Sequence, residues 1–535
     1  MIKQRKYFEI CAGIGRRNVS SSDFPYETKD LLDDMAYYRV HGALVTDVSA
    51  LDYSFVAGNR DLCATVKNNP RLIGAAQIPS TALLETDNAN YFEGLHKNGI
   101  RAFYASPVTL RHTLFPSEME CVARFLIEKN MPLLIRWGEM NPAELIAFLA
   151  AYPDLHVVLI GAHWGSNRIL FPMLERFANL LFEVGSNQAN DILETVKKHF
   201  GIERVLYGTD WPLRPMGTIK GLVEYADISE VDKDAVAAGN ALRLLGLELD
   251  SFSLYDDVEC RLDEIALEAD VGKPISVPVF DAHTHMCPSE DKTVSGLMML
   301  NSDCDSMVRK MNRLGIDSVI IAPWQGICTD GRAGNAQALH AAQKYPGRFY
   351  GFSTCNIHYS GDLTGWREYH EKHPDIFVGI KPYWPYQKFD LTTDICREWY
   401  NYADKQGLLL LLHTDGNDTV LMQAEELIIR YPGIKLILAH SGTDWHVARR
   451  NTELAKRYPN VYLEITYTTC TRGTIEYMVS EAGADKVLYG SDMPMRDPAP
   501  QLAWGAYAKI SIADKKKILA GNIIRLLAEI KGRAK

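Results

Sequence analysis

The chain has 535 residues, of which 47% are hydrophobic, 23% charged and 10% aromatic. This is ordinary globular composition, and the length excludes a single small domain but suits two α/β barrels of about 250 residues each. Lys and Arg number 57 against 67 Asp and Glu, which gives a net charge of -10. That balance argues against a broad nucleic-acid-binding face, so we expect no nucleic-acid partner.

Features that report on the cellular compartment favour the cytosol. The ten cysteines are scattered and include no CxxC pair, which suits a reducing environment. The first residues lack the long apolar core of a signal peptide, and apolar runs such as Leu408 to Leu412 are too short to cross a bilayer. We therefore expect a cytoplasmic protein with no membrane segment.

The same ordered set of sequence strings occurs in both halves of the chain. The matching pairs are NGIRAFY (98–104) with VGIKPYW (378–384), AYPDLHVVLIGAHWG (151–165) with RYPGIKLILAHSG (430–442), NLLFEV (179–184) with NVYLEI (460–465), RVLYGTDWPLRP (204–215) with KVLYGSDMPMRDP (486–498), and AGNALRLLGL (238–247) with AGNIIRLLAEI (520–530). Collinear matches over this length indicate the tandem duplication of a whole domain.

Within each half, short runs rich in Val, Ile and Leu alternate with longer segments of helical periodicity. This alternation is typical of βα units around a parallel sheet that is buried on both faces. In the second half the expected strands are 279–285, 318–323, 349–354, 378–383, 408–414, 436–441, 461–466 and 487–492. Eight such units predict a closed barrel, so we predict an α/β fold of two tandem (β/α)8 TIM-like barrels.

An acidic run separates the two predicted barrels. Residues 248–270 carry nine Asp or Glu against one Arg and precede GKPISVP (272–278). We interpret the run as a solvated helix or strap. The predicted domains are thus a first barrel over 1–247, a linker over 248–277 and a catalytic barrel over 278–535.

Titratable side chains follow four of the apolar runs in the second half. His283 and His285 end the first run, His413 the fifth, His440 comes with the sixth, and Asp492 ends the eighth. The carboxyl ends of barrel strands meet on one face, and residues two apart in a strand point to the same side. Three imidazoles and a carboxylate suit a divalent cation such as Zn²⁺ and leave one position for water.

Seven motifs in the second half also stand in the order of a known family: DAHTH, KYPGRFYGF, GIKPY, HTDG, LAHSG, YGSDMP and AGNIIRLL. Over 278–535 the chain resembles the amidohydrolase-2 branch of the amidohydrolase superfamily, a group of metal-dependent TIM-barrel hydrolases and decarboxylases. The resemblance implies that His283, His285, His413 and Asp492 hold one divalent metal, Zn²⁺ first and Mn²⁺ as the alternative. It implies that His440 activates water or polarises the substrate, and that Asp492 also shuttles a proton.

Four further residues are candidates for substrate contact. Lys381 ends the fourth run, where some superfamily members carry a lysine that bridges two metals. We expect one metal here. Lys381 would then contact either an acidic substrate or a neighbouring carboxylate. Trp324 and Tyr383 follow the second and fourth runs, where aromatic side chains stack on a ring or pack under the helices. Arg496 suits a carboxylate clamp, but its match to Arg214 equally suits a structural role.

The first half lacks three of the four expected metal ligands. By the matched strings, Cys11 replaces His283, Gly13 replaces His285, and Arg136 replaces His413, while His163 and Asp210 are kept. A fixed guanidinium at that place repels a cation. We predict a degenerate, metal-free barrel. One possible role is to replace the second subunit of a dimer, so that the two barrels form an intramolecular pseudo-dimer, which can assemble further into a homo-oligomer. The other is to bind an anionic effector or substrate.

The leading functional hypothesis is a metal-dependent hydrolase that attacks an ester, lactone or amide bond of a small acidic or cyclic molecule with metal-activated water. The alternatives are a metal-dependent decarboxylase or hydratase acting on a small carboxylic acid, and a non-catalytic metal-binding scaffold or sensor. His440 and Asp492 argue against the scaffold, because a structural zinc site is normally closed by four protein ligands without a spare acid–base pair.

Overall fold

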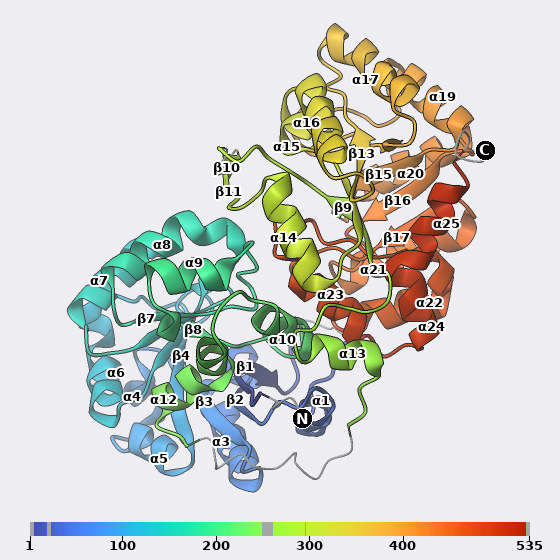
Figure 1. The fold of residues 1–535 in the computed structure, drawn as a ribbon. Helices are drawn as coiled ribbons and strands as arrows, with labels where there is room; N and C mark the ends of the chain where they lie inside the picture. Colours follow the sequence, from blue (N-terminus) through green and yellow to red (C-terminus); the bar gives the residue numbers. More distant parts are fainter. Residues whose placement is uncertain are drawn as a thin grey trace. The chain divides into compact units, whose positions relative to one another are not determined.

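The computed structural model describes residues 5–18, 23–248, 260–290, 292–294, 296–414 and 416–530. The chain divides into two compact units, Met1–Leu262 and Asp263–Lys535. Each unit contains an eight-stranded sheet whose strands alternate with helices (Figure 1). The predicted α/β fold of two tandem TIM-like barrels is therefore confirmed.

In the first barrel the strands follow one another around the sheet in chain order, and neighbours are parallel. The sheet closes where the Ile10 N–H donates to the Tyr207 carbonyl at 3.1 Å. Its strands are β1 (Phe8–Ile14), β2 (Gly42–Asp47), β3 (Leu72–Gln77), β4 (Ile100–Ala105), β5 (Leu133–Arg136), β6 (Val157–Ile160), β7 (Leu180–Glu183) and β8 (Val205–Leu206). Its helices are α1 (Thr28–Tyr38), α2 (Ser49–Asp52), α3 (Phe55–Asn68), α4 (Ala82–Thr86), α5 (Tyr91–Lys97), α6 (Pro116–Lys129), α7 (Pro142–Ala151), α8 (Asn167–Arg176), α9 (Ile192–His199), α10 (Met216–Glu224), α11 (Glu230–Asp234) and α12 (Asn240–Leu245).

The second barrel repeats this arrangement, and it closes where the Ala282 N–H donates to the Tyr489 carbonyl at 3.0 Å. Its strands are β9 (Phe280–Thr284), β12 (Ser318–Ile321), β13 (Phe349–Ser353), β14 (Phe377–Ile380), β15 (Leu409–His413), β16 (Lys435–Ala439), β17 (Val461–Glu464) and β18 (Val487–Leu488), beside a small hairpin of β10 (Thr293–Val294) and β11 (Leu297–Met298). Its helices are α13 (Glu264–Ala269), α14 (Cys304–Leu314), α15 (Trp324–Cys328), α16 (Gly331–Lys344), α17 (Ser360–Lys372), α18 (Trp384–Gln387), α19 (Arg397–Gln406), α20 (Asp418–Arg430), α21 (Trp445–Arg457), α22 (Thr474–Ala482), α23 (Pro498–Tyr507), α24 (Ile512–Lys516) and α25 (Asn522–Ala528).

The apolar strands and amphipathic helices follow from the sequence pattern. In β15 the four leucines are fully buried, because one strand face fills the barrel and the other lies under helices. Charged and apolar residues alternate with helical periodicity in α14, which begins at the Asp303 side chain, an acceptor for two backbone N–H groups. Over the described ranges, no helix is both long and apolar enough to cross a bilayer.

The duplication extends to irregular backbone. A π-helical turn stands before α12 at Ala235–Gly239, and another stands before α25 at Lys517–Gly521. Asp210 and Asp492, which match in sequence, both have left-handed backbone, with φ of 54° and 64°. The two barrels thus share a local geometry in which the residue after strand eight turns sharply at the mouth.

The segment predicted as a linker differs from expectation in its second half. Residues 249–259 lie outside the described residues, but α13 belongs to the second unit and packs against α23. Asp270 accepts a hydrogen bond from the Tyr507 hydroxyl at 2.7 Å. Leu262, Ile265, Ala266 and Ala269 form a buried stripe at helical spacing, which the acidic composition concealed.

We predict that Asp270→Ala destabilises the second barrel by about 1–3 kcal/mol, because the buried Tyr507 hydroxyl loses its acceptor. In a barrel of this size that corresponds to a fall in melting temperature of roughly 2–4 °C per kcal/mol. The control is Glu264→Ala, which removes an exposed ion pair to Lys516 and should change the melting temperature little. Equal effects of the two substitutions would show that this segment is only a spacer.

Candidate metal centre

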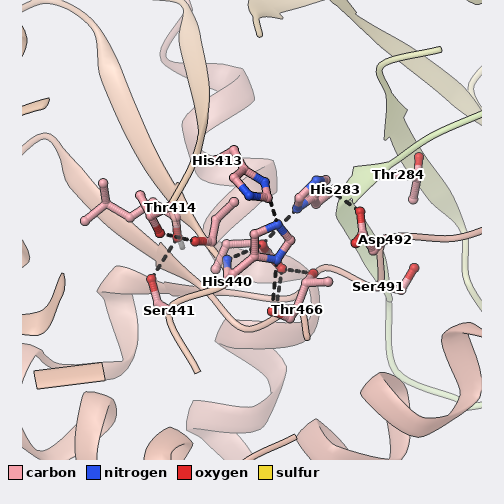
Figure 2. Close-up of polar contacts among 12 residues, drawn as sticks. His283, Thr284, His413, Thr414, His440, Ser441, Thr466, Ser491 and Asp492 are labelled. Atoms are coloured by element: carbon pink, nitrogen blue, oxygen red, sulfur yellow. Dashed lines mark hydrogen bonds and ion pairs between the residues drawn. The ribbon is translucent and has the colours of Figure 1, made fainter. Parts of the chain in front are cut away.

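The predicted site residues of the second barrel meet at the carboxyl ends of its strands. His283 lies in β9, His413 ends β15, His440 follows β16, and Asp492 follows β18 (Figure 2). His283, His440 and Asp492 are at most 3% exposed. The site is therefore a buried cluster of imidazoles and one carboxylate at the strand ends.

Three potential ligand atoms converge on one point of this cluster. The Nε2 atoms of His283 and His285 lie 3.3 Å and 2.9 Å from Oδ1 of Asp492. Within the described part of the chain, this trio and a second one, formed by His283, His440 and Glu464, are the sets of three side chains close enough to share an ion. Both sets lie in the second barrel.

Hydrogen bonds on the far side of each ring fix which nitrogen faces the ion site. Nδ1 of His283 lies 3.0 Å from Oε2 of Glu464, and Nδ1 of His285 lies 2.9 Å from the Ala322 carbonyl. Both partners are acceptors, so both Nδ1 atoms carry the hydrogen and both Nε2 atoms present lone pairs. The lone pairs point at Asp492 Oδ1, which is buried and accepts no hydrogen bond from the described residues. This donor set fits a divalent cation.

His413 and His440 form a pair beside this trio. Nδ1 of His440 faces the Thr466 carbonyl at 3.2 Å and therefore donates, so its Nε2 accepts from Nδ1 of His413 at 3.1 Å. This tautomer gives Nε2 of His413 a lone pair. His413 thus contacts His440 and stands outside both convergent trios.

Burial keeps the three central histidines uncharged. It lowers the pKa of His283 and His440 well below the usual value, and that of His285 below it; Lys381 acts in the same direction on His283 and His285. Neutral imidazole is the form that binds a metal.

Asp492 is held in its ionised form by Arg496. Burial alone would raise the pKa of Asp492, but the Arg496 guanidinium, with Nη1 at 2.5 Å from Oδ2, holds it well below the usual value. Nε of Arg496 donates to the Thr468 hydroxyl at 2.6 Å, and the side chain is buried. Arg496 therefore positions Asp492.

Lys381 points into the same cluster. Its Nζ lies 2.8 Å from Nε2 of His283, and burial lowers its pKa to about 8, against the opposing effect of Asp492. The Lys381 ammonium thus donates a hydrogen bond to the Nε2 lone pair of His283, which is the lone pair that would bind a metal. An ion bound through His283 requires this hydrogen bond to open.

Aromatic side chains line the site on the side of β12 and β14. Trp324 packs edge-on against His285 with ring centroids 5.2 Å apart, and Tyr383 packs in the same way on His413 at 5.6 Å. Trp384 donates its indole N–H to the His413 carbonyl at 2.9 Å. The indole nitrogen of Trp324 is buried and has no acceptor among the described residues, so it is a candidate donor to a ligand.

Two buried acids of the site were not predicted from the sequence. Glu464 supports His283 and also accepts the backbone N–H groups of His440 and Thr466. Asp281 accepts the backbone N–H groups of His283 and Ser491, each at 3.1 Å. Burial raises their pKa values to about 8 and about 7. One signal in the sequence could have revealed them. Both halves carry an acid inside these two apolar strands: Glu183 matches Glu464, and Glu9 matches Asp281.

The first barrel builds an ion pair at the matching place. Arg136 donates from Nη1 to Oδ2 and from Nη2 to Oδ1 of Asp210, at 2.9 Å and 2.7 Å. His163 is exposed. The guanidinium thus lies against the carboxylate that corresponds to Asp492, and it supplies that carboxylate's counter-charge.

Comparison with known proteins assigns the family. The amidohydrolase family model matches residues 24–247 and 280–528. Gamma-resorcylate decarboxylase of Polaromonas sp. is 24% identical over 278 residues, which cover 41% of this chain and 85% of that protein. Crystal structures of 2,6-dihydroxybenzoate decarboxylase from Rhizobium (17% identity, TM-score 0.37) and of a manganese-containing dihydroxybenzoic acid decarboxylase from Polaromonas sp. (18%, 0.35) each match 47% of this chain and 98% or 97% of theirs.

The chain therefore belongs to the amidohydrolase family, and both of its halves match the family model. This confirms the resemblance noted in the sequence and the tandem duplication. The protein is a metal-dependent enzyme, a hydrolase or a carbon–carbon lyase, and not a non-catalytic scaffold.

We predict that Glu464→Gln weakens metal binding by about 10- to 100-fold, because His283 loses the carboxyl acceptor that orients it. Metal content after dialysis against a graded chelator measures the effect. Glu183→Gln is the matched control in the first barrel and should leave the metal content unchanged. If Glu464→Gln kept the metal as well as the unaltered protein, the assignment of His283 as a ligand would be wrong.

Proposed function

We propose that the second barrel is a metal-dependent decarboxylase of a small hydroxylated aromatic acid. The observation that carries the proposal is the convergence of the His283 and His285 lone pairs on the buried Asp492, in a chain that is similar to a gamma-resorcylate decarboxylase. The hydrolase that we expected first gives way to its alternative, because that relative breaks a carbon–carbon bond.

One divalent ion, Zn²⁺ or Mn²⁺, would be held by His283, His285, His413 and Asp492. When bound, such an ion supplies Lewis-acid attraction for substrate oxygens. Arg496 keeps Asp492 in place, and Glu464 and Ala322 keep the two imidazoles turned toward the ion.

Decarboxylation breaks the bond between the ring carbon and the carboxyl carbon, and its electron pair stays on the ring carbon, which then takes up a proton. Asp492 is the residue placed to accept a proton from a substrate hydroxyl and return it to that carbon, since its Oδ1 has no N–H donor bonded to it within the described residues. His440 acts on His413, whose ring it fixes through Nε2.

An aromatic substrate suits the walls of the site. Trp324 and Tyr383 present rings beside His285 and His413, and offset or edge-on contacts between such rings contribute about 0.5–1.5 kcal/mol each. The buried indole N–H of Trp324 would donate to a substrate oxygen. Lys381 would face the acidic group of the substrate after its hydrogen bond to His283 has opened.

For the first barrel we infer that no metal is bound. Arg136 contacts both carboxylate oxygens of Asp210, and Cys11 and Gly13 stand where the first two imidazoles would be. A cation would have to displace a guanidinium that is always charged, at the cost of two charge-assisted hydrogen bonds.

We predict close to one divalent ion per purified chain, as measured by elemental analysis. His283→Ala and His413→Ala should lose it, because each removes one ligand of a four-ligand set. Asp210→Ala is the control in the first barrel and should leave the ion count unchanged. Two ions per chain, or loss of half the metal on Asp210→Ala, would contradict a single site in the second barrel.

We predict that the metal-loaded protein releases carbon dioxide from 2,6-dihydroxybenzoate or a related hydroxybenzoate, with the decarboxylated phenol as the second product. Asp492→Asn should lower kcat by about 10²–10⁴-fold, the range of a lost acid–base group. Coupled carbon dioxide detection and chromatography of the phenol measure the reaction. Turnover of esters, lactones or amides with no carbon dioxide release would instead establish the hydrolase.

A further inference from the structure

The first barrel has a cavity at the end of the sheet opposite its mouth. We call it the basal cavity; its volume is about 300 Å³, and His156, Leu181, Arg204 and Arg243 are among its lining residues. His156 and Arg204 directly precede β6 and β8, so the cavity lies at the amino ends of the strands. It is separate from the Arg136–Asp210 pair, which stands at the carboxyl ends.

Three cationic or ionisable nitrogen side chains face this cavity. Arg204 is buried and fixed, because its Nε donates to the Leu180 carbonyl at 2.6 Å and its Nη2 donates to the Phe177 carbonyl. Arg243 donates to the Asn240 side-chain oxygen at 2.9 Å. Among the described residues, no carboxylate lies within ion-pair distance of Arg204, Arg243 or His156.

These charges affect one another. Burial lowers the pKa of His156, and Arg204 and Arg243 lower it further. Glu203 is the one acid in the lining against two arginines; Glu203, His156 and Arg243 are exposed, and Arg204 is buried. The basal cavity is therefore a region of positive potential in a chain that is acidic overall.

The second barrel shows how the same arrangement is neutralised. The aligned repeats place Lys435 at the position of His156, Lys486 at that of Arg204, and Arg525 at that of Arg243. There Glu529 pairs with Lys435 at 3.8 Å and with Arg525 at 3.2 Å. The Tyr462 ring lies against Lys486, with Nζ 5.1 Å from its centroid.

Both neutralising groups are absent from the first barrel. Leu181 stands at the position of Tyr462, and Leu247 stands at the position of Glu529. The first change removes an aromatic ring from the space beside Arg204, and the second removes the carboxylate that would pair with Arg243 and His156. The first barrel thus has basic residues at the same three positions but lacks the two side chains that pack against them or pair with them in the second barrel.

We propose that the basal cavity binds a small organic dianion, either a phosphate monoester or a dicarboxylate. The guanidinium groups of Arg204 and Arg243 both line the cavity and attract an anion, and a cavity of this size admits a small ligand. The site lies in the metal-free barrel and does not depend on the decarboxylase reaction.

The test uses the full-length protein and isothermal titration with inorganic phosphate and, separately, with succinate. We expect saturable binding of one anion per chain, and the tighter of the two probes identifies the class of ligand. Arg243→Gln should weaken this binding at least tenfold. Arg525→Gln, the matched substitution in the second barrel, should leave it unchanged.

Two further variants replace a residue of the first barrel with the residue that the second barrel has at the matching position. Leu181→Tyr should abolish binding by filling the cavity, and Leu247→Glu should abolish it by supplying an internal carboxylate. Leu247 is only partly buried, so this variant keeps the test decisive if Leu181→Tyr does not fold. The proposal is overturned if neither probe binds, if Leu247→Glu binds as well as the unaltered protein, or if Arg525→Gln weakens binding as much as Arg243→Gln.

Discussion

The chemistry of this protein depends on the contact between two imidazole lone pairs and one buried carboxylate. His283 and His285 each donate their Nδ1 hydrogen to a fixed acceptor, so each turns an unprotonated Nε2 toward Asp492. Arg496 holds that carboxylate ionised from the other side. Such a group of acceptors is stable inside a protein only with positive charge beside it, which Lys381 provides in this structure and a divalent ion would provide in the active enzyme.

The two halves satisfy this need for positive charge in different ways on one backbone. Each barrel keeps the left-handed turn at its strand-eight aspartate, at Asp210 and Asp492. In the first barrel the balancing charge comes from Arg136, which is covalently part of the chain and cannot be exchanged. In the second barrel the corresponding residue is a histidine, so the charge can be a bound ion. The two barrels also differ at the opposite end, where Leu247 and Leu181 of the first barrel match Glu529 and Tyr462 of the second.

Much of this could be predicted from the sequence, because periodicity and repetition are local signals. The eight apolar runs of the second half correspond to β9 and to the strands from β12 to β18, and family motifs placed His283, His285, His440 and Asp492 at one mouth. The acidic run was harder to interpret, since composition hid the apolar stripe of α13 that packs on α23. Glu464 was missed because the sequence does not show that this acid, in strand β17, contacts the His283 ring from strand β9.

The sequence by itself determined the duplication, the barrel class and the set of chemically able residues, because each of these depends on spacing along the chain. Only the tertiary structure decided which ring nitrogens face the ion site, that Arg496 serves Asp492, and that Lys381 bonds to His283. These contacts join residues that are brought together only when the barrel closes. The direction of a hydrogen bond, unlike the alternation of apolar residues, depends on a partner from another strand.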